Sequence, residues 1–339
     1  MQKTMSRMLI ETSVRNALAR CEESPERATR NLVDLGLNFS NGRFQKRLLT
    51  TIQRMLANQD SAYYPLIRDV LENVDSERLL RFGVNLGYEG CTLGARTIRA
   101  VEAEHDFNVP WALSLVVDGS LPERLPRYGQ VIRQGLELGI HTFLLKIEGD
   151  PACAASLPLL AEDGAFVLFL EGRQITRELV DALRPVQNIL VVVRSGPEAE
   201  RACARLRLAQ FPYGVYARYR SAGGVLDEAW FAGILPLHPI LAFLVPERGC
   251  PRPDQQEVYR RVCALRNEQR YPVVPIELKR DLLWIDKMIS DDDVMAVFDS
   301  RGDLHTGDGP ACGPDCNVFR ADLPDIFHRA LAKRAALSR

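Results

Sequence analysis

Short apolar runs alternate with stretches of helical spacing from Pro110 onward, and this alternation constrains the fold more than any other feature of the chain. Each run is long enough for one buried strand, and each helical stretch is long enough for a crossover connection. Continuous apolar strands joined by crossover helices predict a parallel sheet that helices cover on both faces. The predicted strands are Trp111–Val117, Thr142–Lys146, Phe166–Leu170, Ile189–Val193, Gly214–Tyr219, Ile240–Val245 and Tyr271–Ile276.

The repetition of strand–helix units predicts an α/β fold built as a full or partial (β/α) barrel, and a doubly wound open sheet is the alternative. The helices are predicted near Arg127–Leu138, Ala154–Ala161, Thr176–Leu183, Glu198–Ala209, Leu226–Gly233 and Asp254–Gln269. Either architecture binds its ligand beyond the carboxyl ends of the strands. The segments expected there are 118–120, 147–151, 171–174, 194–196, 220–224, 246–250 and 277–280.

The first part of the chain has helical spacing throughout. Ser24 and Pro25 form a typical helix start, with an N-cap and a proline in the first turn. An apolar stripe indicates one helix face, whereas Gly87–Gly90 predicts a turn. We therefore expect a helical region over residues 1–105, a barrel over 106–300, and a Gly/Cys loop with a helix over 301–339. The stripe is Phe44, Leu48, Ile52 and Leu56.

The composition excludes several classes of protein. Lys and Arg number 43 against 44 Asp and Glu, so no basic surplus indicates a nucleic-acid partner. The longest apolar stretch, residues 233–245, is interrupted by Pro236, His238 and Pro239 and is too short to span a bilayer. The eight cysteines are scattered along the chain, as in proteins with reduced thiols. We expect a cytoplasmic protein with no membrane segment.

The segment Phe107–Pro151 resembles the opening of radical SAM proteins of the SPASM-associated type. It has an Asn-x-Pro-Trp sequence before the first strand and a helix that ends in QGLELGI. Tyr213–Tyr219 with Ser221 resembles the fifth strand and its turn, and Pro253–Arg266 resembles a late helix of that family. This resemblance implies a radical-SAM-like (β/α) partial TIM barrel with a helical N-terminal extension.

The loop after the first strand departs from the family. In radical SAM proteins, a C-x3-C-x2-C motif in this loop holds a [4Fe–4S] cluster through its thiolates. The loop Asp118–Leu125 contains no cysteine, and no such motif occurs anywhere in the chain. The expectation is therefore a protein without an iron–sulfur cluster and without ordinary radical SAM chemistry.

Six residues occupy positions that correspond, by the resemblance, to a degenerate SAM site. Glu148, Gly149, Asp150 and Pro151 stand where the family has a GGEP-like turn that presents backbone groups to the SAM amino group. Arg194 and Ser195 follow the fourth strand, near the position that the family uses for the ribose. The resemblance thus leaves SAM as a candidate ligand. The two acids could also do acid–base work, but we expect capping because a helix start follows Asp150.

Charged residues at several strand ends form a second candidate site. Forked guanidinium groups could bind a carboxylate or phosphate, or the charges could pair with one another where a cofactor would sit. Strand alternation puts Arg218 and Arg220 on one face and Tyr219 on the other. The candidate pocket residues are Arg218, Arg220, Glu277 and Lys279, with Arg194 and Arg280 beside them.

Cys312 and Cys316 are the one clustered pair of cysteines and the candidate metal ligands, with Cys250 or His305 to complete a site. Two ligands are fewer than the four of a typical zinc site, so a loop with two free thiols is the alternative. The acidic run Asp291–Asp293 lacks the spacing of a calcium loop and is interpreted as a helix start or a solvated turn.

Three functions are compatible with this pattern. The first is a radical-SAM-like pseudoenzyme that serves as a binding or scaffold partner of an active radical SAM enzyme or of its precursor peptide. The second is a repurposed barrel enzyme that binds SAM or an anionic metabolite and runs cluster-independent chemistry. The third is an unrelated TIM-barrel enzyme that acts on an anionic substrate.

Overall fold

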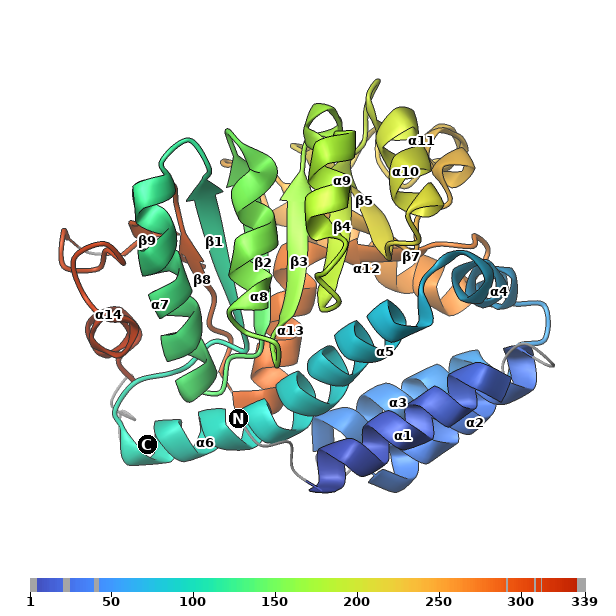
Figure 1. Cartoon of the computed structure of the whole chain (residues 1–339), viewed down its shortest axis with the longest axis horizontal. Coiled ribbons are helices and arrows are strands. Elements are labelled where there is room, and N and C mark those ends of the chain that lie inside the picture. Colours follow the sequence, from blue (N-terminus) through green and yellow to red (C-terminus); the bar gives the residue numbers. More distant parts are fainter. Residues whose placement is uncertain are drawn as a thin grey trace. The chain divides into compact units, whose positions relative to one another are not determined.

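A computed structural model of the 339-residue chain describes residues 5–20, 25–39, 43–290, 292–307, 309–311 and 313–333 (Figure 1). The chain divides into two compact units. The first unit comprises Met1–Val84, Phe169–Asp181 and Leu190–Asp281, and the second comprises Asn85–Leu168, Ala182–Ile189 and Leu282–Arg339.

Helices make up the described part of the chain before the first strand. Helix α2 begins at Pro25, as predicted, and Ser24 lies outside the described residues. Leu56 is buried against Val33 and Tyr64, with Ile52 packed beside them, whereas the side chains of Phe44 and Leu48 lie outside the described part. The helices are α1 (Met5–Arg20), α2 (Pro25–Phe39), α3 (Arg43–Met55), α4 (Tyr63–Asn73), α5 (Ser76–Val84) and α6 (Ala95–Glu104).

The predicted turn at Gly87–Gly90 is wrong, because a π-helix, η1 (Asn85–Gly94), occupies this stretch between α5 and α6. Of its glycines, Gly94 allows a close approach of backbone, whereas Gly87 has no atom within 4 Å of its Cβ position. A Cβ atom on Gly94 would lie only 2.3 Å from the carbonyl oxygen of Gly139. The Asn85 side chain donates to the carbonyl groups of Glu162 and Gly164, at 2.7 and 2.8 Å, and so fixes the start of η1.

Seven strands then alternate with helices, and all seven predicted strands are present within three residues of their expected ends. The strands are β1 (Ala112–Asp118), β2 (Thr142–Glu148), β3 (Ala165–Leu170), β4 (Ile189–Arg194), β5 (Tyr213–Tyr219), β6 (Leu241–Pro246) and β7 (Val274–Glu277). The helices are η2 (Pro122–Arg124), α7 (Leu125–Glu137), η3 (Pro151–Ala155), α8 (Ser156–Leu159), η4 (Gly172–Gln174), α9 (Arg177–Leu183), α10 (Ala199–Leu208), α11 (Glu228–Ile234), η5 (Leu235–Leu237) and α12 (Arg252–Glu268).

Strands β1 to β7 follow one another in the sheet in their chain order, with β8 on the other side of β1. A doubly wound sheet reverses its strand order at a switch point, so this order excludes that alternative. The α/β fold with a (β/α) partial TIM barrel and a helical N-terminal extension is confirmed. Every residue of β3 is buried, as expected for a strand of a sheet that is covered on both faces.

The register of the parallel pairs fixes which residues stand side by side within each unit. In the second unit, Asp118 at the end of β1 stands beside Glu148 at the end of β2. In the first unit, Arg194 of β4 pairs with Tyr216 of β5. Asp118 and Glu148 therefore lie at the carboxyl ends of their strands, where ligands bind in such folds, whereas Tyr216 lies three residues before the end of β5.

Four further elements were not predicted. Helix α13 (Leu278–Ser290) begins directly after β7, where a loop was expected. Three short strands follow, β8 (Ala296–Phe298), β9 (Leu304–Thr306) and β10 (Gly309–Pro310), with β8 parallel to β1 and the other two antiparallel. A last helix, α14 (Leu323–Ala330), matches the helix expected near the C-terminus.

Asp292 and Asp293 lie between α13 and β8, and the turn interpretation of this acidic run agrees with their place; Asp291 lies outside the described residues. The Asp292 carboxylate accepts a hydrogen bond from the Asn108 side chain at 2.6 Å. Within the described ranges, no helix combines the length and apolar character that crossing a bilayer requires.

Candidate functional site

The loop after β1 packs directly on the turn after β2, and we call the contact of Asp118–Ser120 with Glu148–Asp150 the closed corner. The Gly119 amide donates to the Glu148 carbonyl at 2.8 Å. A Cβ atom on Gly119 would lie 1.8 Å from the Asp150 carbonyl oxygen, and one on Gly149 would lie 2.2 Å from Ser120 Oγ. Gly149 also has a φ of +69°, which favours glycine. Backbone therefore meets backbone at these strand ends.

The carboxylates of the β2 turn already have partners. Lys146 Nζ pairs with Glu148 Oε1 at 2.5 Å. Asp150 is the N-cap of η3, and its Oδ1 accepts from the Ala152 amide at 3.0 Å. The capping role expected for Asp150 is therefore confirmed. Pro151 occupies the first position of η3, where its missing N–H costs nothing.

Cys153 is the one cysteine close to the closed corner within the described second unit, and it is a poor metal ligand. It is buried, and its thiol donates to the Asp150 carbonyl at 3.3 Å. Burial raises its pKa to about 11, and the nearby Asp150 charge adds to this effect. The thiol therefore stays protonated at neutral pH, whereas cluster binding requires thiolates. The donors of this corner do not fit a [4Fe–4S] cluster.

Arg194 and Ser195, at the end of β4, belong to a network in the first unit. The Arg194 guanidinium pairs with Glu171 at 3.3 Å, and the Tyr216 hydroxyl donates to the same carboxylate at 3.2 Å. Burial, with the Glu171 charge beside it, raises the pKa of Tyr216 to about 12. The Ser195 amide donates to the Tyr216 carbonyl at 2.8 Å. Arg194 therefore pairs with an acid of its own unit, and about half of its side chain is exposed.

Glu277, the last residue of β7, is fully buried and joins β5 to α13. Its carboxylate accepts from the Tyr219 hydroxyl at 2.5 Å and from the Arg280 amide at 2.6 Å. Burial raises the pKa of Glu277 and of Tyr219. Next to it, Asp281 accepts from the Glu277 amide at 3.1 Å and pairs with Arg266 at 2.9 Å.

The four residues predicted to share an anion pocket are thus not all in one environment. Arg218 and Arg220 are exposed, and Tyr219 between them is buried, as strand alternation predicts. Glu277 lies in the buried network with Tyr219, and Lys279 is half-buried in the first turn of α13. Arg220 has no hydrogen bond or ion pair among the described residues. The exposed arginines therefore remain available to a ligand, whereas Glu277 is buried and hydrogen-bonded within the fold.

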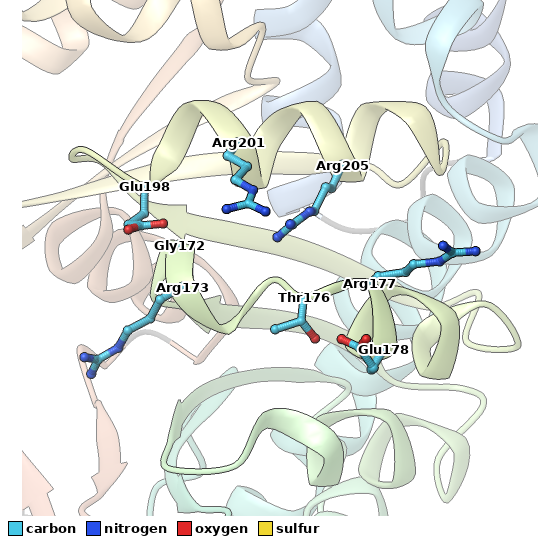
Figure 2. Close-up of a pocket in the computed structure, with 8 residues that line it drawn as sticks. All are labelled: Gly172, Arg173, Thr176, Arg177, Glu178, Glu198, Arg201 and Arg205. Carbon is cyan, nitrogen blue, oxygen red and sulfur yellow. The ribbon is translucent and has the colours of Figure 1, made fainter.

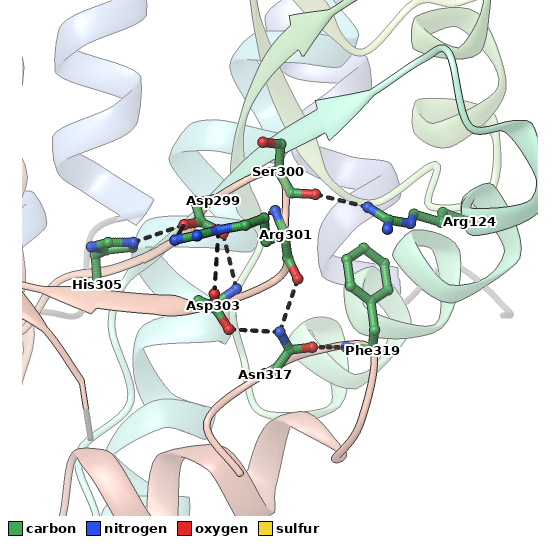
Figure 3. A network of polar contacts seen from close by, with 8 residues as sticks. All are labelled: Arg124, Asp299, Ser300, Arg301, Asp303, His305, Asn317 and Phe319. Atoms are coloured by element: carbon green, nitrogen blue, oxygen red, sulfur yellow. Dashed lines mark hydrogen bonds and ion pairs between the residues drawn. The ribbon is translucent and has the colours of Figure 1, made fainter. Parts of the chain in front are cut away.

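The cysteine pair near the C-terminus yields no metal site in the described part of the chain. Cys312 lies outside the described residues, and Cys316 is buried. His305, a possible third ligand in the sequence analysis, pairs with Asp299 at 3.1 Å (Figure 3). Across residues 5–333, leaving aside the gaps, no group of three His, Cys, Asp or Glu side chains is arranged to hold a metal ion.

Asp299 organises the hairpin between β8 and β9 (Figure 3). Its carboxylate accepts from the amides of Arg301 and Asp303 at 2.9 and 3.1 Å. Asn317 donates to the Arg301 carbonyl and to Asp303, and so ties the following loop to the hairpin. The sequence does not reveal this network, because its members contact one another through turns and short strands that have no periodic signal.

Glu171 was also missed as a site residue, although it lies in one of the strand-end segments, 171–174. It forms a capping box with Gln174, whose side chain accepts from the Glu171 amide at 2.8 Å. The sequence signal for this role is an acid, Glu171, followed three residues later by Gln174, which is the spacing of a capping box.

No family model matches the chain, and no curated protein matches it. Among solved structures, SuiB from Streptococcus suis matches at 10% identity and a TM-score of 0.49, over 87% of this chain and 78% of SuiB. SuiB bound to the precursor peptide SuiA matches at 11% identity and a TM-score of 0.48, over 68% of this chain and 67% of that chain. Native anSMEcpe with bound AdoMet and Cp18Cys peptide matches at 11% identity and a TM-score of 0.42, over 64% of this chain and 80% of that chain. A likeness at this level of identity assigns no activity to this chain.

Proposed function

We propose that this chain is a radical-SAM-like protein without cluster chemistry, which serves as a binding or scaffold partner of an active radical SAM enzyme or of its peptide substrate. The observation that carries the proposal is the closed corner. The Gly119 amide and the Glu148 carbonyl are bonded at 2.8 Å where the family's cluster loop would stand, and the loop has no thiol.

The chemistry of the neighbouring groups supports a non-catalytic role. General acid–base catalysis needs a group that can exchange a proton with a bound substrate. Asp150 caps η3, and Glu148 pairs with Lys146. Glu277 is buried and accepts a hydrogen bond from the Tyr219 hydroxyl. Each of these carboxylates is committed to a contact within the fold, which suits a stable binding surface better than a reaction centre.

Co-expression tests the partner role. The chain would be expressed with the radical SAM enzyme and the precursor peptide encoded by neighbouring genes, and the mixture analysed by gel filtration. We expect this chain to elute together with the enzyme or with the peptide. In the control, which contains neither, the chain should elute at the position of the free protein. Elution alone in every mixture would contradict the scaffold function.

A second function, binding of SAM or of an anionic metabolite, is favoured by one observation. Arg218 and Arg220 are exposed at the end of β5 on either side of buried Tyr219. Guanidinium forks in this position suit a carboxylate or phosphate group. Calorimetric titration with SAM separates the functions, because micromolar binding that weakens in an Arg218→Ala/Arg220→Ala variant supports this one and no binding supports the scaffold role.

A further inference from the structure

The first unit contains a pocket of about 380 Å³ that the candidate site does not include. It lies among η4, the start of α9 and helix α10 (Figure 2). Its lining is charged or polar, with no aromatic or aliphatic side chain apart from one threonine methyl. The lining residues are Gly172, Arg173, Thr176, Arg177, Glu178, Glu198, Arg201 and Arg205, and we call this the arginine pocket.

The frame of the arginine pocket is held by close packing. A Cβ atom on Gly172 would lie 2.6 Å from Glu198 Cβ, so η4 rests directly on the start of α10. The capping box of Glu171 and Gln174 fixes η4 itself. Arg205 Nη1 donates to the Ile175 carbonyl at 2.7 Å and ties α10 to the same loop. The remaining arginines therefore project from a fixed support.

The arginines of the pocket are poorly neutralised by their own unit. Arg173 and Arg201 are exposed and have no hydrogen bond or ion pair among the described residues. Arg177 stands 3.8 Å from Asp181, and both side chains are largely exposed, so this pair is weak. The lining contains four arginines and two glutamates. The pocket is therefore a positively charged hollow with unused guanidinium donors.

The arrangement of these charges indicates the shape of the ligand. Figure 2 shows Arg201 and Arg205 together, directed from α10 toward the loop of Thr176, and Arg173 and Arg177 at opposite ends. A compact dianion could reach the central pair but not both ends. Glu178 and Glu198 interrupt the row and would repel a uniformly charged group.

We propose that the arginine pocket binds an acidic peptide segment in extended conformation, whose Asp or Glu side chains engage the guanidinium groups. Forked guanidinium donors match carboxylates in a bidentate way. Successive side chains of an extended segment point to alternate sides, so acids can meet the arginines while neutral residues pass the glutamates. The absence of an aromatic or apolar lining disfavours a nucleobase. This inference rests on the proposed function only in taking the partner to be a peptide.

The test is fluorescence anisotropy with a labelled twelve-residue peptide of alternating Glu and Gly, in low salt. Arg173→Ala/Arg201→Ala should weaken binding about tenfold, since two exposed ion pairs are lost. Arg133→Ala is the matched control, because Arg133 of α7 is exposed and unpaired within the part of the chain that the structure describes, and its affinity for the peptide should stay within about twofold of the wild type. Glu178→Gln/Glu198→Gln should tighten binding. Because these side chains are exposed, circular dichroism melting should show an unchanged fold.

Three results would overturn the inference. The first is that a Gln–Gly peptide binds as tightly as the Glu–Gly peptide. The second is that Arg133→Ala weakens binding as much as the double arginine variant does. The third is that inorganic phosphate displaces the labelled peptide at concentrations where unlabelled Glu–Gly peptide does not. The last would indicate a compact-anion site. Failure of the scaffold function is seen separately, because elution alone in the co-expression assay leaves the anisotropy result with the Glu–Gly peptide unchanged.

Discussion

The closed corner and the arginine pocket use their polar groups in opposite ways. At the closed corner, in the second unit, the Gly119 amide is hydrogen-bonded to the Glu148 carbonyl, there is no room for a Cβ atom on Gly119, and the nearby carboxylates have partners. In the arginine pocket, in the first unit, Arg173 and Arg201 project from a fixed frame and have no hydrogen bond or ion pair among the described residues. The difference shows that strand-end loops of one fold can be filled by their own chain in one place and remain available for binding in another.

The largest effect is expected from filling the closed corner further. In Gly119→Ala, the added methyl would lie 1.8 Å from the Asp150 carbonyl oxygen, so the loop must move. We expect the free energy of unfolding, measured by urea denaturation, to fall by about 3 kcal/mol. Gly87→Ala is the matched control, because no atom lies within 4 Å of its Cβ position. Equal stability of Gly119→Ala and the control would show that the corner is not closed.

The buried network of the first unit should respond next most strongly. Tyr219→Phe removes the hydroxyl that donates to Glu277, and the free energy of unfolding should fall by about 2 kcal/mol. Tyr271→Phe is the control and should cost little, because the Tyr271 hydroxyl has no hydrogen bond to the described residues. Unchanged stability of Tyr219→Phe would mean that Glu277 does not depend on this hydroxyl.

The same variant predicts a pH dependence. Burial already holds the folded-state pKa of Glu277 above its unfolded value, so the group's contribution to stability is fully present below the unfolded pKa of about 4.3 and is lost as pH rises through the folded pKa. Tyr219→Phe raises that pKa further. The loss in free energy of unfolding of Tyr219→Phe relative to the wild type should therefore be larger at pH 8 than at pH 5. Equal losses at the two pH values would contradict an ionising Glu277.

A smaller effect is expected at the N-cap of η3. Asp150→Ala removes the acceptor of the Ala152 amide, so the free energy of unfolding, measured by urea denaturation, should fall by about 1 kcal/mol. Asp227→Ala at the N-cap of α11 should have a similar effect. Asp150→Asn should be nearly neutral, because asparagine caps as well as aspartate. A large cost of the Asn variant would assign the Asp150 charge a role beyond capping.

The smallest effect on stability is expected in the arginine pocket. Arg173→Ala/Arg201→Ala should change the free energy of unfolding by less than about 0.5 kcal/mol, because both side chains are exposed and neither is paired within the described ranges of the chain. Arg266→Ala is the contrast, since it leaves buried Asp281 unpaired and should cost about 3 kcal/mol. A comparable cost for both would mean that the pocket arginines support the fold rather than a ligand.

Sequence patterns predicted the parts of the fold that depend on local apolar spacing. Strands β1 to β7 are continuous apolar runs, and burial on both faces of a parallel sheet makes such runs conspicuous. Strands β8 to β10 have only two or three residues each, too few for a periodic signal. The turn prediction at Gly87–Gly90 was wrong because glycines also occur inside helices, here in η1, where Gly94 permits a close approach to Gly139.

The candidate site was predictable only in outline. Alternation correctly separated Tyr219 from Arg218 and Arg220 because it is a property of one strand. It could not show that Glu277, some sixty residues later, bonds to Tyr219, since that contact depends on the sheet register. The arginine pocket was missed for the same reason, because α10 supplies Arg201 and Arg205 while η4 supplies Arg173.

Iron and acid-labile sulfide analysis after anaerobic reconstitution tests the central claim most directly. The account predicts less than about half an iron per chain, and the same value in Cys153→Ser, because the closed corner offers no thiolate set. About four irons and four sulfides per chain, the content of one [4Fe–4S] cluster, would contradict it.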